Sequence, residues 1–202
     1  MSLFFVPIPL KTMKFPALDK AVADDDLRES LSYVYVDKEI TFASDAHIMV
    51  IHKTEELFDA EFIKKIGDDT ITMHAEMIKA IRSNKCHSID IDDENSRIIL
   101  KPKPGDRKKP AIHFNIIGMD CNPPKYQPIL EAARKGKEIK EISLNSLLLN
   151  NLREALGIPT RVGLYIKFNG ETLGMYCRTN GDSDYPSAVG MIMPVQIQRE
   201  GK

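Results

Sequence analysis

Hydrophobic and polar residues follow three similar blocks along the chain, each starting about 65 residues after the one before. In each block, apolar residues first fit a strand, then recur at helical spacing, and then alternate through three more strands. The helices are predicted at residues 15–30, 75–84 and 146–156. The pattern therefore predicts an α+β fold of repeated strand-helix-strand-strand-strand units, with the helices on one side of antiparallel sheets. A general α+β sandwich without a repeat is the alternative.

The blocks also suggest a division of the chain. Residues 1–118 hold two blocks and predict one domain, residues 119–138 predict a linker rich in Pro and Asn at its start, and residues 139–202 hold the third block. A further helical segment is predicted at 54–69, ended by Gly67. Strands are expected at 32–36, 39–43, 47–52, 70–73, 88–92, 97–101, 111–117, 140–144, 161–169, 171–178 and 188–197.

Composition narrows the class of protein. Of the 202 residues, 43% are hydrophobic and 28% charged, which is typical of soluble globular proteins. No apolar run approaches the roughly 20 residues of a membrane span, and residues 4–10 lack the basic start of a signal peptide. Cys86, Cys121 and Cys177 have no CxxC spacing, which argues against a disulfide framework or a zinc site. We therefore expect a cytoplasmic protein without metal.

Candidate catalytic chemistry is sparse. The sequence contains no HExxH, P-loop or GxGxxG motif and no Ser-His-Asp signature. The pair Asp45 and His47 could carry acid–base chemistry, although two residues that share a strand face need not be catalytic. The acidic stretch 90–95 lacks the central Gly and the later Glu of a calcium loop, so it predicts a hairpin turn. We expect no enzyme activity and no cofactor.

Four segments resemble the bacterial sliding clamps, the beta subunits of replicative DNA polymerase, in the order of that family. Residues 44–49, Ser-Asp-Ala-His-Ile-Met, resemble the family's Thr-Asp-Gly-His-Arg-Leu. Residues 72–81 resemble the strand and helix that open the second half of a clamp domain. Residues 120–130 resemble the linker Gly-Arg-Phe-Pro-Asp-Tyr-Arg-Arg-Val-Leu-Pro, and residues 188–197 resemble the C-terminal Tyr-Val-Val-Met-Pro-Met-Arg-Leu.

The resemblance implies a groove for short peptides of polymerases and other replication proteins. Apolar walls with adaptable Met side chains suit aliphatic and aromatic anchors. Leu31 is a candidate for the floor of the groove. In the alternative interpretation, the same residues are core residues that seal the join between two units. The implied lining consists of Ser44, Ala46, His47, Ile48, Met49, Pro124, Tyr126, Ile129, Met191, Met193 and Pro194.

The resemblance also implies helices that face double-stranded DNA and contact its phosphates without reading bases. Because the net charge is only -1, such contact needs a local basic face. The first predicted helix carries Asp24, Asp25, Asp26 and Glu29, which would repel a duplex, and solvated surface is the alternative for any single cation. The implied DNA-binding residues are Lys79, Arg82, Lys85 and Arg153.

The chain departs from the family in ways that bear on function. A bacterial clamp subunit has six such units and closes a twelve-unit ring as a dimer, whereas this chain has three. The family's Gly is Ala46 here, its following Arg is Ile48, and a linker Arg is Pro128.

Our leading hypothesis is a sliding-clamp-like replication accessory, or processivity factor, that binds polymerase or repair proteins and DNA. It would self-associate, either as four copies in a ring or through sheet edges. A clamp-fold interaction or DNA-binding module of phage or mobile-element type that forms no ring is the second hypothesis. A small enzyme built on Asp45 and His47 is the third. The oligomeric state separates the first two.

Overall fold

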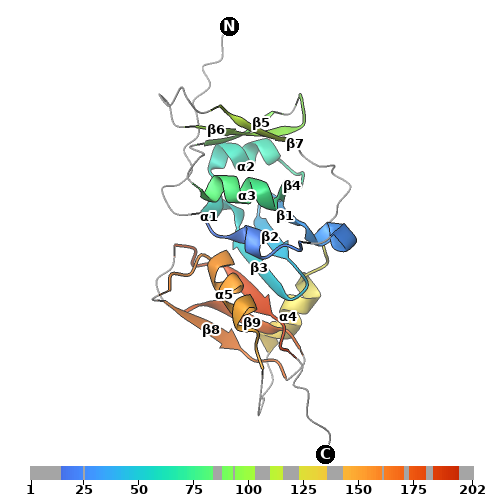
Figure 1. Ribbon diagram of the computed structural model, residues 1–202, viewed down its shortest axis with the longest axis vertical. Helices are drawn as coiled ribbons and strands as arrows, with labels where there is room; N and C mark the ends of the chain where they lie inside the picture. The colour runs from blue at the N-terminus through green and yellow to red at the C-terminus, as the bar shows by residue number, and fades with distance from the viewer. Residues whose placement is uncertain are drawn as a thin grey trace, which may run out of the picture.

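The computed structural model describes residues 15–24, 26–83, 88–92, 94–102, 110–115, 123–135, 143–160, 162–170, 173–180 and 184–195 (Figure 1). It confirms the α+β class and the antiparallel sheets. No helix among these residues has the length and apolar character needed to cross a membrane. In chain order the elements are η1 (Leu18–Lys20), η2 (Asp26–Leu31), β1 (Tyr33–Val36), β2 (Ile40–Ser44), β3 (Ile48–Lys53), α1 (Thr54–Leu57), α2 (Ala60–Ile66), β4 (Ile71–His74), α3 (Ala75–Arg82), β5 (Ser88–Asp92), β6 (Arg97–Lys101), β7 (Ile112–Asn115), α4 (Gln127–Lys135), α5 (Ser146–Ala155), β8 (Gly163–Lys167), β9 (Met175–Asn180) and β10 (Val189–Ile192).

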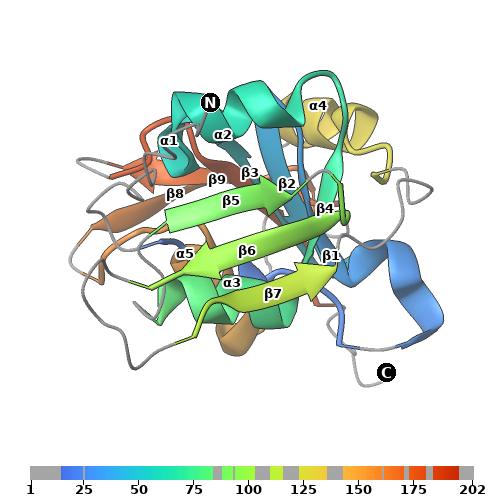
Figure 2. The ribbon, with the colours of Figure 1, turned by 90° about the horizontal axis from the view of Figure 1, so that it is seen from above.

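Strands from all three units form two antiparallel sheets. The larger has seven strands in the order β4-β1-β2-β3-β10-β9-β8, and the smaller has the order β5-β6-β7. Figure 2 looks onto the smaller sheet, which lies at one end of the molecule, with β8 and β9 toward the other end in Figure 1. The pairing of β3 with β10 joins the first unit to the third, with Ile48 opposite Ile192 and Met49 opposite Met191.

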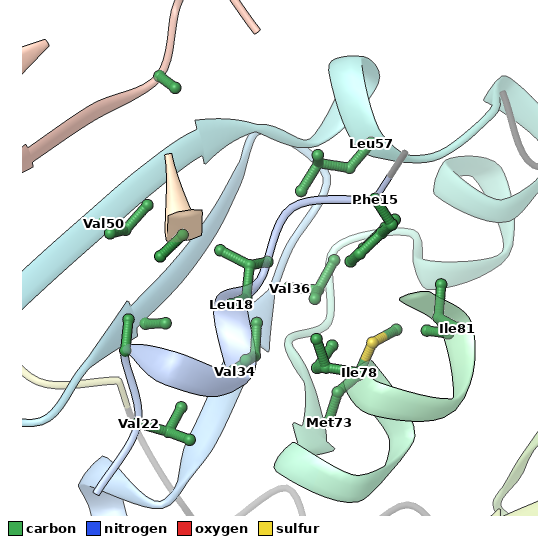
Figure 3. Close-up of a cluster of buried hydrophobic side chains, with 14 of the residues drawn as sticks. Phe15, Leu18, Val22, Val34, Val36, Val50, Leu57, Met73, Ile78 and Ile81 are labelled. Atoms are coloured by element: carbon green, nitrogen blue, oxygen red, sulfur yellow. The ribbon is translucent and has the colours of Figure 1, made fainter. Parts of the chain in front are cut away.

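The large sheet is apolar on both faces, and strand alternation divides its side chains between two cores. Ile48 and Val50 of β3 belong to the main core, which also contains buried residues of α3, α5, η1 and the small sheet. Figure 3 shows Leu18 of η1 near Val34 and Val36, with Ile78 of α3 beside them. Met49 and Ile51 point to the opposite face, which carries a smaller core. Helix α4 covers that second face with Leu130 and Ala133.

The first predicted helix, at 15–30, is wrong as a single α-helix. The described residues there form the two short 3-10 helices η1 and η2 instead. The backbone N–H of Ala17 donates to Glu154 O at 3.1 Å, and that of Ala23 donates to Leu31 O at 2.8 Å. These two backbone hydrogen bonds replace the regular hydrogen bonds of an α-helix. The Asp residues of this segment are poor helix formers. Even so, η1 has the packing contacts expected of the predicted α-helix, because it lies against both α3 and α5.

The other predicted elements mostly form where the pattern places them. The segment 54–69 contains α1 and α2, and α5 begins after Asn145, whose side chain accepts hydrogen bonds from Leu147 N at 2.9 Å and Leu148 N at 3.4 Å. Strands β9 and β10 are shorter than predicted. Among the described residues after Ile192, strand pairing is reduced to the hydrogen bond from Met193 N to His47 O and an isolated bridge between Val195 and Ser143, since Pro194 has no N–H to donate. Of the predicted strand at 140–144, only Ser143, which forms this bridge, and Leu144, which is in no strand, are described.

Two residues allow α5 to pack closely over the β3–β10 pair. A Cβ atom at Gly190 would lie 2.8 Å from Met49 O and 2.7 Å from Leu152 Cδ1, so only glycine fits there. His52 of β3 is buried, and its Nε2 atom lies 2.9 Å from Ala155 O. Its ring packs edge to face against the Tyr185 ring. Because a carbonyl can only accept, Nε2 carries the proton, and burial lowers the pKa of His52 from its ordinary value of 6.5 to about 4.

The buried imidazole predicts a pH-dependent stability. Its pKa is lower in the folded chain than in the unfolded chain, so its contribution is complete above pH 6.5 and is lost as the pH falls toward 4. We expect this residue to remove about 3 kcal/mol of unfolding free energy between pH 7 and pH 4. The His52→Gln variant keeps an N–H donor for Ala155 O without a titratable ring, and it should lose that part of the dependence. Urea unfolding of both proteins across this range gives the free energy of unfolding at each pH. Equal pH slopes of this free energy in the two proteins would contradict the assignment.

Candidate functional site

The turn between β2 and β3 is shaped by its own side chains. Asp45 Oδ1 accepts hydrogen bonds from the backbone N–H groups of His47 at 2.8 Å and Ile48 at 2.7 Å. Ser44 Oγ donates to Ile48 O at 2.9 Å and accepts from Ala46 N at 3.2 Å. These bonds give Ser44 and Asp45 a role in forming the turn, with the His47 side chain exposed at its tip. These two hydrogen bonds of Asp45 therefore join its Oδ1 atom to backbone donors of the turn and not to the His47 ring.

The end of β10 lies against this turn. Met193 N donates a hydrogen bond of 2.8 Å to His47 O, and Met191 pairs with Met49 in the ladder. From the segment before α4, Tyr126 stacks on Phe42 of β2 with ring centroids 4.8 Å apart. Three separate stretches of the chain therefore meet at the β3–β10 junction.

The apolar side chains that meet there form one group, which we call the junction cluster. Its deepest members are well buried, with Met49 at 2% and Met191 at 6% exposure. Tyr126 and Met193 lie partly buried at its edge and remain accessible. The junction cluster consists of Tyr33, Tyr35, Phe42, Met49, Ile51, Leu130, Ala133 and Met191, with Ile40, Tyr126, Tyr176, Val189 and Met193 packed against it.

Helix α4 occupies the surface over the middle of the junction cluster. Leu130 and Ala133 face inward one turn apart, and the Arg134 guanidinium lies 5.5 Å from the Tyr176 ring centroid. Leu130 and Ala133 of α4 thus belong to the same apolar cluster as the predicted lining residues Met49 and Met191. Of the predicted lining, Ala46 and His47 are exposed at the turn, and Pro124, Tyr126, Met193 and Pro194 are partly exposed.

Some predicted groove residues lie elsewhere. Ile48 is fully buried in the main core, because neighbouring strand residues point to opposite faces and Met49 takes the outer one. Ile129 is 51% exposed on α4, and Leu31, at the end of η2, belongs to neither core. Phe42, Leu130 and Ala133 were missed. The i, i+3 spacing of the last two was the signal for an apolar helix face, although it does not say which surface that face covers.

The edge of the junction cluster has an acidic side. Burial raises the pKa of the Tyr126 hydroxyl, and the negative charges of Asp37 and Glu39 raise it further, against a hydrogen bond with Gln127 that lowers it. The phenol is therefore neutral at physiological pH and can donate a hydrogen bond. An apolar partner group with a nearby positive charge would suit this edge.

The predicted DNA-binding residues all have internal partners where they are described. Arg82 Nη2 lies 3.2 Å from Asp19 Oδ2, and Lys79 lies 2.8 Å from Glu76 on the same helix. Arg153 donates to Ile158 O at 2.9 Å and to Asn150 Oδ1 at 3.0 Å, near the end of α5. Lys85 lies outside the described residues.

Arg82 and Arg153 also line a cavity of about 430 Å³ between α3, α5 and residues 15–17. Glu154 and Asp184 line the same cavity, so its charged groups balance. This face of the molecule therefore lacks the row of free cations that phosphate binding uses, as far as the described residues go.

The geometry matches solved bacterial sliding clamps. A β sliding clamp from Caulobacter crescentus has a TM-score of 0.62 and 13% identity, with 98% of this chain and 67% of that chain covered. The clamp of Bacillus subtilis has a TM-score of 0.55 and 13% identity, covering 96% and 67%. The DNA polymerase III beta chain of Streptococcus pneumoniae has a TM-score of 0.57 and 11% identity, covering 98% and 67%. No family model and no curated protein matches the sequence.

These similarities confirm the resemblance at the level of fold. The chain has the fold of the bacterial DNA polymerase sliding clamps and spans about two thirds of the length of the clamp chains that it matches.

The turn of the candidate site predicts a stabilising substitution. Ala46 has a φ of 75°, in the left-handed region that glycine adopts without strain. We expect Ala46→Gly to raise the free energy of unfolding by about 0.5 to 1 kcal/mol, since relief of strain exceeds the added entropy of the unfolded chain. Ala43→Gly, in strand β2, is the matched control and should destabilise. Denaturant unfolding of the three proteins measures this, and a destabilised Ala46→Gly variant would contradict the turn geometry.

Proposed function

We propose that this chain is a clamp-type accessory protein of DNA replication that binds short linear segments of polymerase or repair proteins without catalysing a reaction. One observation supports the proposal most strongly. Tyr126 and Met193, from two distant stretches of the chain, both pack against the junction cluster and stay partly exposed, and Met193 N is bonded to the turn at His47 O.

The side chains at this edge suit a peptide with an apolar anchor. Met193 can adjust its conformation to the shape of an aliphatic or aromatic group, and Tyr126 offers a ring face with a polar hydroxyl. Asp37 and Glu39 add negative charge near Tyr126. The preferred segment therefore carries a Leu or Phe anchor beside a basic or neutral residue, and it binds next to α4 with that helix in place.

Double-stranded DNA binding is the less supported part of this proposal. In the part of the chain that is described, Arg82, Arg153 and Lys79 each have an internal partner, so phosphate contact would have to compete with those bonds. A clamp-fold interaction module that forms no ring is the alternative. A ring of the family's size would need four copies of this three-unit chain, so the mass of the protein in solution distinguishes the two.

The peptide surface predicts which truncations weaken binding. Met193→Ala and Tyr126→Ala each remove an accessible anchor, so each should weaken binding by about 1 to 3 kcal/mol, or roughly 5- to 150-fold in Kd. Leu147→Ala is the matched control, because Leu147 is also an exposed apolar residue but lies on α5. Fluorescence anisotropy of a labelled peptide with a Leu-Phe anchor gives the three affinities.

Two outcomes would contradict the proposal. One is wild-type protein that binds no such peptide at several hundred micromolar, and the other is equal loss of affinity in the Leu147→Ala control. Circular dichroism melts of each variant separate loss of binding from loss of fold. Tyr126→Phe keeps the ring and should retain most of the affinity.

A further inference from the structure

The face of β8 and β9 that points away from the main core carries aromatic and basic side chains. Alternate residues of both strands, such as Leu164 and Cys177, belong to the main core, so the residues between them lie on the opposite face. Together with Arg134 of α4, these outward residues form a surface that we call the tyrosine-arginine face. Its members are Arg134, Tyr165, Lys167, Tyr176 and Arg178.

Each tyrosine of this face has a guanidinium against its ring. Tyr165 of β8 lies directly opposite Arg178 of β9 in the ladder, and the Arg178 Cζ atom is 4.7 Å from the Tyr165 ring centroid. The Arg134 Cζ atom is 5.5 Å from the Tyr176 ring centroid. Tyr176 is the diagonal neighbour of Tyr165 across the two strands, which separates their Cα atoms by about 7 to 8 Å. The two stacked pairs therefore lie side by side on one surface.

The positive charges of this face are accessible and have no acidic partner in the part of the chain that is described. Arg134 and Arg178 are exposed, Tyr165 is 39% exposed, and Tyr176 and Lys167 are partly exposed. No described carboxylate lies within ion-pair distance of the three cations. The predicted DNA-binding cations of α3 and α5 differ in this respect, because their charges are bonded internally.

This combination of side chains suits a flexible strand of nucleotides. Aromatic rings and guanidinium planes stack on unpaired bases, and cations beside them contact the phosphates that alternate with those bases. Duplex DNA fits less well, because its bases are stacked on one another and a flat sheet face does not enter a groove. An acidic peptide would match the charge but would not need two neighbouring stacking surfaces.

We propose that the tyrosine-arginine face binds single-stranded nucleic acid without sequence preference. Tyr165 and Tyr176, each with its guanidinium, offer stacking surfaces for two bases, and the N–H groups of the cations donate to phosphates. The surface lies on the opposite side of the large sheet from α3 and α5, so it is separate from the helices considered above for duplex DNA. The inference does not depend on the proposed function.

Fluorescence anisotropy with labelled strands of about 12 deoxythymidine or uridine nucleotides tests the proposal. We expect the wild-type protein to bind at least one of them with a Kd below about 100 µM at about 50 mM salt, and to bind a duplex of equal length at least about fivefold more weakly. Three phosphate contacts predict binding that is roughly 15- to 20-fold weaker at about 200 mM salt. The strand that binds more tightly identifies DNA or RNA as the ligand.

Substitutions on this face separate stacking from charge. Tyr165→Ala should weaken binding about 5- to 150-fold, because it removes one stacking surface, whereas Tyr165→Phe should retain most of the affinity. Arg178→Gln should lower the slope of log K against log salt by about 0.7. His113→Ala and Arg97→Gln are the matched controls and should leave binding unchanged, because they remove an exposed ring and an exposed cation from strands of the small sheet.

Four results would overturn the proposal. They are wild-type protein that binds neither strand at several hundred micromolar, duplex binding as tight as single-strand binding, equal losses in the two controls, and full affinity in Tyr165→Ala with displacement of the strand by polyglutamate. The last result would assign the face to acidic peptides. Circular dichroism melts show whether each variant is folded. Because Arg178 is exposed, Arg178→Gln keeps the test decisive where Tyr165→Ala lowers stability.

Discussion

The antiparallel pairing of β3 with β10 is the constraint on which the rest of the structure depends. It joins a strand of the first unit to the last described strand of the chain and so builds one continuous seven-stranded sheet. The register sends Ile48 and Ile192 to the main core, and Met49 and Met191 to the junction cluster. A slip of one residue would exchange the two faces. Closing so long a loop costs entropy, which burial of apolar surface on both faces offsets.

Close packing of α5 reinforces this pairing on the main-core side. Gly190 lets Leu152 approach the sheet, and the His52 imidazole donates across the gap to Ala155 O. On the opposite face, α4 provides a second cover through Leu130 and Ala133. The centre of the junction therefore seals the join between units, and Tyr126 and Met193 packed against it remain partly exposed.

An element of the fold could be predicted from the sequence where nearby residues alone determine it. Strands β5 and β6 have the bounds that the pattern gave, because Ser88–Asp92 alternates strictly and polar turn residues bound both strands. The helix predicted at 15–30 failed, because its apolar spacing competes with a run of Asp residues and with the hydrogen bond from Ala17 N to Glu154 O. A bond between residues so far apart in the chain leaves no trace in a local pattern.

The candidate site was predictable in part, for similar reasons. Met49, Tyr126, Met191 and Met193 followed from the resemblance to clamps and do meet at one junction. Ile48 was included by the same resemblance, although strand alternation already separates it from Met49. Arg82 was expected to face DNA by the same resemblance, and its bond to Asp19, 63 residues earlier in sequence, could not be read from a local pattern. The cover provided by α4 depends on tertiary packing, which the amphipathic pattern of that helix does not specify.

Methionine methyl NMR tests the central claim, that the β3–β10 junction forms the partner-binding surface. The chain has nine methionines, and those at 49, 191 and 193 lie in or against the junction cluster, whereas Met73 and Met77 lie in the main core. On titration with a peptide carrying a Leu-Phe anchor, the Met193 methyl signal should shift most, with smaller shifts at Met191 and Met49 and none at Met73 or Met77. A peptide that binds without moving the Met193 signal, or that moves Met73 and Met77 instead, would contradict this account.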